Sequence, residues 1–434
     1  MLDRRLPERA AGDTQALTAR SLYASWRRGE IVLKWGAVLL GASIPVSVAL
    51  DNVLLYVLLF FWLIGGAYRD KLASIRDNPV SWLALALWAL FVVGSAYSIG
   101  TRDDVLAAVG KAMRLLAIPV LIYLLRDPVW RERGIAAFLA SMLVTLLLSC
   151  LLWLDLVPGN GWIKGSPLDP VVFKAHITHN VFMAFAAFLF AQAALDANTP
   201  RARIALGVLC AAASANVLLM VPGRTGMLVL VVLFVYFLGR VYNRAKGLAL
   251  AGVAVAVLAA IVLASPESML HRRITLADEE YAQWRAGIPP EPTSSVGLRL
   301  EMLKNTLEII GHNPAIGVGT GGFSRAYADR VVGTGAQATE NPHNEILLMI
   351  VQFGIAGFAL FAALLFVQWR IAARLPTRFD QATARAFVLT IAVTSLFSST
   401  LLDHSEGVFF AYMGGLLFAG YRAGMPDAWR QRAS

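Results

Sequence analysis

Twelve apolar runs, each close to the length that crosses a bilayer, constrain the fold of this chain more than any other feature. A membrane-spanning helix needs about 20 apolar residues. The backbone of each run must be helical because lipid offers no hydrogen-bond partners. The sequence therefore predicts an all-α, polytopic membrane helical bundle with about twelve transmembrane helices. The runs lie at 32–50, 52–68, 80–99, 105–125, 134–157, 179–195, 203–221, 226–239, 247–264, 342–369, 384–402 and 406–421.

The overall composition agrees with a membrane protein. Of the 434 residues, 58% are hydrophobic and 15% are charged, and the mean hydropathy is +0.63. Soluble domains carry roughly 45–50% apolar and about 25% charged residues. The net charge of +10 does not indicate a nucleic-acid partner, because the basic residues fall in short loops between spans. Cys150 and Cys210 lie inside apolar runs and predict neither a disulfide framework nor a metal site.

The Lys and Arg residues of the short loops predict the orientation of the bundle. One set of loops and both tails carry most of them, whereas the opposite short loops carry only Arg102, Lys164, Lys174 and Arg224. Since basic loops stay on the cytoplasmic side, both termini are predicted to be cytoplasmic. The polar, arginine-rich residues 1–30 do not resemble a cleavable signal peptide.

One long polar segment, residues 265–341, interrupts the apolar runs and is predicted to lie outside the cytoplasm. Within it, residues 296–310 place four apolar side chains at helical spacing and predict a helix. The predicted organisation is a cytoplasmic tail at 1–31, transmembrane helices 1–9 at 32–264, a large periplasmic loop with helices at 265–341, transmembrane helices 10–12 at 342–421 and a cytoplasmic tail at 422–434.

The motifs that are absent narrow the chemistry. The chain has no Walker loop, no dinucleotide-binding fingerprint, no His-Glu-x-x-His and no Asp-x-Asp that would hold a nucleotide sugar through a metal. No nucleotide pool exists outside the membrane, so a bond-forming enzyme there needs a pre-activated substrate. A lipid diphosphate is the natural candidate, and the sequence predicts no metal and no other cofactor.

His343 is the predicted catalytic base. Asn341 can cap a helix that begins at Pro342, which would make His343 the second helical residue. The positive end of the helix dipole disfavours imidazolium, and a neutral imidazole is the form that a general base needs. The alternative is an interfacial or capping histidine with no reaction. Gly354 and Gly357 would fall within roughly 40° of His343 on that helix, where helix packing is favoured over a lipid groove.

A site for a lipid diphosphate also requires arginine, because planar guanidinium groups bind two diphosphate oxygens at once. Arg224, at the predicted outer start of the eighth span, is a functional candidate by default. Arg299 lies on the predicted outer helix, where a solvated helix face is the alternative. Lys174 is a third diphosphate-binding candidate. Arg102, on an outer loop, and Arg114, in the fourth span, are weaker candidates, and Arg114 can also snorkel to the membrane surface.

The other histidines are competing candidates. His176 and His179 could suggest a metal, but two histidines without a third ligand are weak evidence. His404, within Asp403-His404-Ser405-Glu406, is the main rival base, and the alternative there is a capped turn between two spans.

Two motifs resemble those of a known family. His343-Asn344, nine residues and then Gly354-x-x-Gly357 resembles the signature of the O-antigen ligase and polymerase family. Residues 311–319, Gly-His-Asn-Pro-Ala-Ile-Gly-Val-Gly, are similar to the turn that precedes that family's histidine, and the twelve-span layout is similar too. The resemblance covers about residues 170–425.

The resemblance implies an O-antigen ligase with a GT-C-type glycosyltransferase fold in the bacterial inner membrane. The implied partners are an undecaprenyl-diphosphate-linked glycan donor, a lipid A–core acceptor and membrane lipids, and the implied transfer is metal-independent and inverting, on the periplasmic face. By this resemblance His343 matches the essential histidine, with Asn344 beside it. Arg224, in Gly-Arg-Thr-Gly, matches one essential arginine, and Arg299 matches the arginine of the large loop.

Three alternatives remain open at this point. An O-antigen polymerase would use a second undecaprenyl-linked chain as the acceptor, and a protein O-oligosaccharyltransferase would use a Ser or Thr. A polytopic transporter of a lipid-linked or anionic substrate is the alternative from another class, although no internal repeat is visible.

Overall fold

The computed structural model describes residues 29–421 apart from 160, 243–244, 248, 251, 254–268, 289, 292–293 and 335. Within these ranges the chain is helical, and the one β-type contact is an isolated bridge between Ser166 and Asp169. The prediction of an all-α protein is therefore confirmed.

Seven helices of the described chain are long and apolar enough to cross a membrane. An eighth is added if α2 (Val48–Ile64) and α3 (Tyr68–Asp77), which are bent by 116°, count as one span. The seven are α4 (Pro79–Gly94) with η1 (Ser95–Tyr97), α5 (Arg102–Ala112) with η2 (Met113–Leu116) and α6 (Ala117–Leu124), α7 (Pro128–Trp153), α8 (His176–Asp196), α9 (Pro200–Ala215) with η3 (Asn216–Met220), α10 (Arg224–Val241) and α15 (Glu345–Ala372).

The total of twelve spans stays a prediction. The run at 247–264 lies mostly outside the described residues. The runs at 384–402 and 406–421 correspond to α16 (Arg378–Thr394) and α17 (His404–Leu416), which are shorter than predicted.

The predicted boundary at residue 51, between the runs 32–50 and 52–68, is wrong. The first helix covers residues 29–43, and the turn follows at 44–46. Ser47 then caps α2 by accepting a hydrogen bond from the Leu50 amide at 3.3 Å. Asp51 therefore lies inside the first turn of α2, where it is buried. A Ser two residues after a Pro provides an N-cap that the apolar pattern alone does not reveal.

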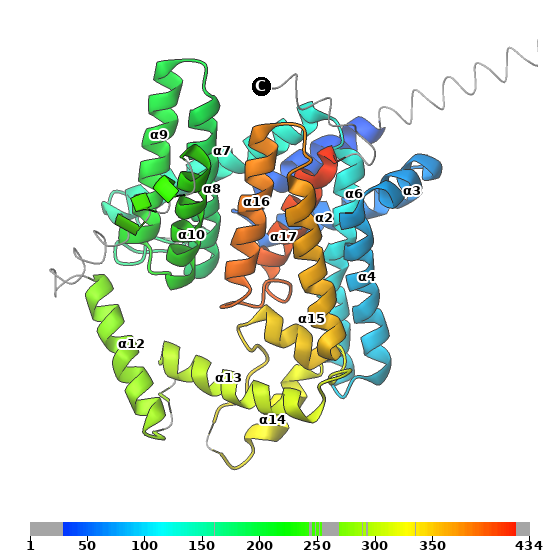
Figure 1. Ribbon diagram of the computed structural model, residues 1–434, viewed down its shortest axis with the longest axis vertical. Helices are drawn as coiled ribbons and strands as arrows, with labels where there is room; N and C mark the ends of the chain where they lie inside the picture. The colour runs from blue at the N-terminus through cyan, green and yellow to red at the C-terminus, as the bar shows by residue number, and fades with distance from the viewer. Residues whose placement is uncertain are drawn as a thin grey trace, which may run out of the picture.

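Two helices form the centre of the bundle. Every residue of α17 after His404 is buried, and α8 is buried over most of its length. A helix that is apolar on all sides must be surrounded by other helices. Accordingly α8 packs against α9, α10 and α16, and α17 packs against α6 (Figure 1). The rings of Phe138, Phe182 and Phe409 meet between α7, α8 and α17.

The helices of the long polar segment lie together at one end of the bundle, here called the loop end (Figure 1). They are α12 (Met269–Arg285), α13 (Ser295–His312) and α14 (Phe323–Val331). Ser294 caps α13 by accepting from the Gly297 amide at 3.1 Å. The predicted helix at 296–310 is thus confirmed.

A break in α15 receives the turn at 311–319. Gly354 has φ +61° and ψ −154°, and the helix changes direction there (Figure 1). The Val318 and Gly319 amides donate to the carbonyls of Val351 (2.8 Å) and Gln352 (2.9 Å), and the Ile355 amide donates to Pro314 O (3.1 Å). A Cβ on Gly354 would lie 2.1 Å from Ala315 O. The break supplies the carbonyls that the turn needs, so the two family-like motifs bind each other through the main chain.

The helical projection of Gly354 and Gly357 from His343 is therefore wrong. The histidine precedes α15, and Gly354 interrupts it. A Cβ on Gly357 would lie 2.5 Å from Met349 O and 2.7 Å from Phe353 Cβ, so this glycine lets the two halves of α15 approach. Both glycines make close backbone packing possible.

Candidate active site

A cavity of about 370 Å³ opens where α10, α13 and the segment before α15 meet at the loop end. Arg224, Arg299 and His343 all line it, although they come from three distant parts of the chain. Its remaining lining is mostly apolar and consists of Thr225, Leu228, Val296, Leu300, Leu303, Pro342, Asn344, Leu347, Leu396 and Phe397.

Arg224 is placed by the close approach of α10 to α8. It is the first residue of α10, directly after Gly223. A Cβ on Gly226 would lie 2.3 Å from Asn180 Cβ, and a Cβ on Gly223 would lie 2.4 Å from Asn180 Nδ2. The Asn180 amide also donates to Val221 O at 3.0 Å. The two glycines around Arg224 thus fix the start of α10 against α8, which confirms the predicted position of Arg224 at a span start.

His343 lies outside the helix, contrary to the prediction. Asn344, not Asn341, is the N-cap of α15, and its side chain accepts from the Leu347 amide at 3.0 Å. His343 has φ +50°, a left-handed conformation that is uncommon outside glycine. Asn341 stabilises this turn, because its Oδ1 accepts from the His343 amide at 2.8 Å.

The loop at 395–403 holds the turn from the other side. Ser399 Oγ donates to the same Asn341 Oδ1 at 2.6 Å, and Asn344 Nδ2 donates to Leu396 O at 3.1 Å. The backbone of His343 is therefore fixed by side chains on both sides of it. Sequence reasoning missed Asn341 and Ser399 in this role. The hydroxyl-rich run at 398–400, near the end of the predicted span at 384–402, was the available signal.

The charges around the cavity favour a neutral histidine. Burial lowers the pKa of His343, and the positive charge of Arg299 lowers it further, against a weaker opposite effect of Asp403. Burial also lowers the pKa of Arg299, and the charge of Arg224 adds to this. The two guanidinium groups are thus close enough to repel each other. A bound anion would relieve that repulsion.

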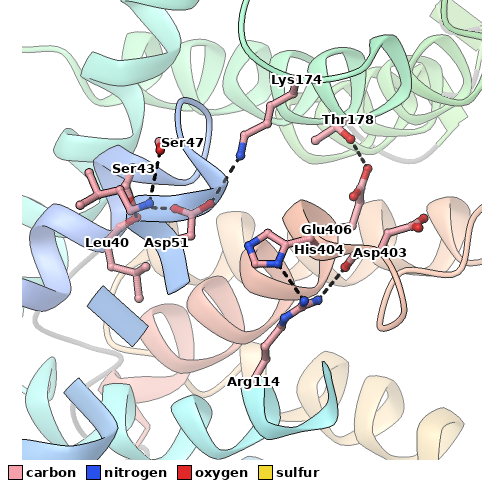
Figure 2. Close-up of polar contacts among 11 residues, drawn as sticks. Leu40, Ser43, Ser47, Asp51, Arg114, Lys174, Thr178, Asp403, His404 and Glu406 are labelled. Atoms are coloured by element: carbon pink, nitrogen blue, oxygen red, sulfur yellow. Dashed lines mark hydrogen bonds and ion pairs between the residues drawn. The ribbon is translucent and has the colours of Figure 1, made fainter. Parts of the chain in front are cut away.

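Lys174 and Arg102 lie elsewhere. Lys174 is buried and forms an ion pair with Asp51 at 3.5 Å, and Ser43 Oγ donates to the other oxygen of that carboxylate at 2.6 Å (Figure 2). The positive charge of Lys174, which was predicted to bind diphosphate, is therefore paired with Asp51. Arg102 is exposed at the first residue of α5.

Arg114 and His404 bind each other (Figure 2). The Arg114 guanidinium donates to Asp403 O at 2.9 Å and contacts His404 Nδ1 at 2.8 Å. Since a guanidinium can only donate, Nδ1 is the acceptor nitrogen and the His404 proton is on Nε2. His404 is therefore occupied by Arg114, while His343 faces the cavity.

His176 and His179 do not form a metal site with each other. His176 is exposed, whereas His179 is fully buried and its Nε2 lies 3.0 Å from Asn216 Oδ1. Among the residues that the structure describes, no three His, Cys, Asp or Glu side chains are grouped so as to hold a metal ion.

The fold and the cavity define a membrane-integral helical protein with a histidine and two arginines at one end of the bundle. Comparison with protein families then gives a match to the O-antigen ligase family over residues 209–362. This range contains Arg224, Arg299, His343 and the glycine pair of α15. The match covers less than half of the chain, and the members of that family are glycosyltransferase-like enzymes that act on lipid-linked glycans. No curated protein matches the chain.

Proposed function

We propose that this protein is an O-antigen ligase, which transfers a glycan from undecaprenyl diphosphate to the lipid A–core oligosaccharide. One observation carries the proposal: His343, Arg224 and Arg299 line the same cavity. The family match supports a function of the ligase or polymerase type. The finer assignment rests on the resemblance of the full His-Asn and Gly-x-x-Gly pattern to that of the ligases.

In this proposal the two arginines hold the donor diphosphate. Their mutual repulsion is relieved when the diphosphate binds, and their charge stabilises the negative charge that develops on the leaving group. The leucines of the lining, among them Leu228 and Leu347, offer an apolar wall to the first part of the prenyl chain. Because diphosphate is a good leaving group once its charge is neutralised, the reaction needs no general acid.

His343 then removes the proton from the attacking hydroxyl of the acceptor. The acceptor oxygen forms a bond to the anomeric carbon as the bond from that carbon to the diphosphate oxygen breaks. The leaving undecaprenyl diphosphate takes the bonding electron pair, and the configuration at the anomeric carbon inverts. Asn341 and Ser399 position His343 by fixing the turn that carries it.

The proposed setting is the bacterial inner membrane, with the loop end on the periplasmic face and both termini in the cytoplasm. A GT-C-type bundle of about twelve transmembrane helices is part of the same proposal. The distribution of basic loops supports this orientation.

The test is transfer by purified protein. Wild type given a lipid-linked glycan and lipid A–core should form a product of lipopolysaccharide size. His343→Ala should abolish this product while the protein still inserts into the membrane. His176→Ala, a change at an exposed histidine outside the cavity lining, is the matched control and should retain activity.

Near-normal transfer by His343→Ala would transfer the role of base to His404. Elongation of the lipid-linked glycan alone would identify a polymerase, and glycan on a Ser or Thr would identify a protein O-oligosaccharyltransferase. Movement of labelled substrate across vesicles without bond formation would identify a transporter.

A further inference from the structure

A second cavity, of about 220 Å³, lies beside the first and differs from it in charge. Carboxylates dominate its polar lining, with Asp104, Glu340, Glu345 and Asp403 around a single Lys111. The rings of Phe91 and Phe323 are also part of the lining. The donor cavity described above is instead lined by two arginines and no carboxylate.

Glu345 is the carboxylate that indicates a ligand. It is fully buried, with 0% of its surface exposed, and it is the first residue of α15. Its Oε2 accepts a hydrogen bond from the Leu401 amide at 2.8 Å. Within the described part of the chain, no hydrogen-bond partner reaches its Oε1. A buried polar atom without a partner is costly, and this one belongs to a side chain that lines the cavity.

Neighbouring residues of the segment that carries His343 line the two cavities. Pro342, His343 and Asn344 line the first cavity, whereas Asn341 and Glu345 line the second. Consecutive Cα atoms are about 3.8 Å apart, so Asn341 and His343 are separated by at most about 7.6 Å. An oligosaccharide longer than one unit can therefore occupy the second cavity and still present a hydroxyl to His343.

We propose that the second cavity, lined by Glu345, Glu340 and Asp403 beside the His343 turn, is the binding site for a neutral sugar unit of the acceptor. This inference rests on the proposed function. Carboxylates accept hydrogen bonds from sugar hydroxyls, and Glu345 Oε1 gains the partner that it lacks. The phenylalanine rings supply apolar surface for the face of a sugar ring.

The charges of the two cavities separate the two substrates. Carboxylates repel a diphosphate, whereas Arg224 and Arg299 attract it. The donor is therefore excluded from the acceptor site, and the acceptor unit bound there is one without phosphate. This arrangement places the leaving group and the incoming sugar in different cavities, both lined by the segment that carries His343.

Calorimetric titration of the purified full-length protein with deacylated core oligosaccharide tests the site directly. Glu345→Gln keeps an oxygen for the Leu401 amide but loses a carboxylate oxygen, so we expect the Kd to rise about tenfold or more. Glu340→Gln, a change at an exposed residue of the same lining, should weaken binding in the same direction. Glu279→Gln, on the exposed surface of α12, is the matched control and should bind like wild type.

Kinetics separate this inference from the proposed function. Glu345→Gln and Glu340→Gln should each raise the KM for lipid A–core and leave the KM for the lipid-linked donor unchanged. A wild-type protein that transfers glycan, with unchanged Kd and acceptor KM in both variants, would overturn the acceptor site alone. A wild-type protein that forms no product, but binds the oligosaccharide in a manner weakened by Glu345→Gln, would overturn the ligase assignment and support the site. The acceptor site would also be overturned if Glu345→Gln weakened oligosaccharide binding and lowered the thermal unfolding midpoint together, while Glu340→Gln bound the oligosaccharide like wild type.

Discussion

The break in α15 provides the most direct test of how this site is built. Gly354 has φ +61° and ψ −154°, a region that costs any other residue about 1–3 kcal/mol. An added Cβ would also lie 2.1 Å from Ala315 O and 2.7 Å from the Ile316 amide nitrogen, both backbone atoms that cannot rotate away. Gly354→Ala should therefore lower the free energy of unfolding by at least about 1–3 kcal/mol.

The loss should extend to activity. Relief of the overlap requires the turn at 311–319 to move off α15, and this breaks the hydrogen bond from the Ile355 amide to Pro314 O. The same movement displaces α13, which ends at His312 and carries Arg299. We expect a thermal unfolding midpoint a few degrees lower in detergent, together with a loss of glycan transfer that exceeds the loss of folded protein.

Gly311→Ala is the matched control. Gly311 lies in α13, and a Cβ there has no heavy atom within 4 Å. Alanine in a helix is favoured over glycine by roughly 1 kcal/mol, so this variant should be as stable as wild type or more so. If Gly354→Ala unfolded at the wild-type temperature and transferred glycan normally, the account of the break would be refuted.

Three further predictions concern the charged residues and the turn. Arg224→Ala and Arg299→Ala should each lower donor turnover by roughly a hundredfold or more in a transfer assay, and unchanged turnover in either would remove that residue from the site. Because the pKa of His343 is lowered, the imidazole stays neutral at pH values below about 6.5, the ordinary pKa of histidine. Wild-type kcat/KM should therefore fall only when the pH drops below that value. Arg299→Gln removes a charge that lowers the pKa of His343, so the acidic limb of the pH profile should move to higher pH. Asn341→Ala removes the acceptor of two hydrogen bonds and should lower kcat about tenfold with little change in the donor KM, whereas a change in KM alone would contradict a positioning role.

Local patterns predicted the helices better than their ends. Apolar length and the rule against exposed backbone in lipid suffice to predict the seven helices of the described chain that are long and apolar enough to cross a membrane. The start of α15 was missed because Asn341 and Asn344 are equally good caps, and Pro342 favours the earlier one. Contacts with residues more than 50 positions away decide between them, since Leu396 and Ser399 bind the two asparagine side chains.

Contacts between residues far apart in the sequence also decide which residues of the candidate site could be predicted. Arg224 could be proposed because it lies at a predicted span start, whereas Arg299 was proposed from the family resemblance, since a solvated helix face was the alternative for it. Lys174 could not be assigned correctly, since its partner Asp51 is 123 residues away. The carboxylate cavity was also invisible in the sequence. Asp104, Glu340 and Asp403 are separated by long stretches, and only the packing of α5, α15 and the loop at 395–403 brings them together.

The main-chain joint between the turn at 311–319 and α15 has a consequence for how such enzymes diversify. Backbone amides and carbonyls form this joint, so its strength does not depend on which side chains the neighbouring segments carry. Residues 269–310 could change in length and composition while the joint keeps its geometry, provided that the glycines remain. A chimera that receives residues 269–310 from a related chain should then acquire the substrate preference of the chain that supplied this segment.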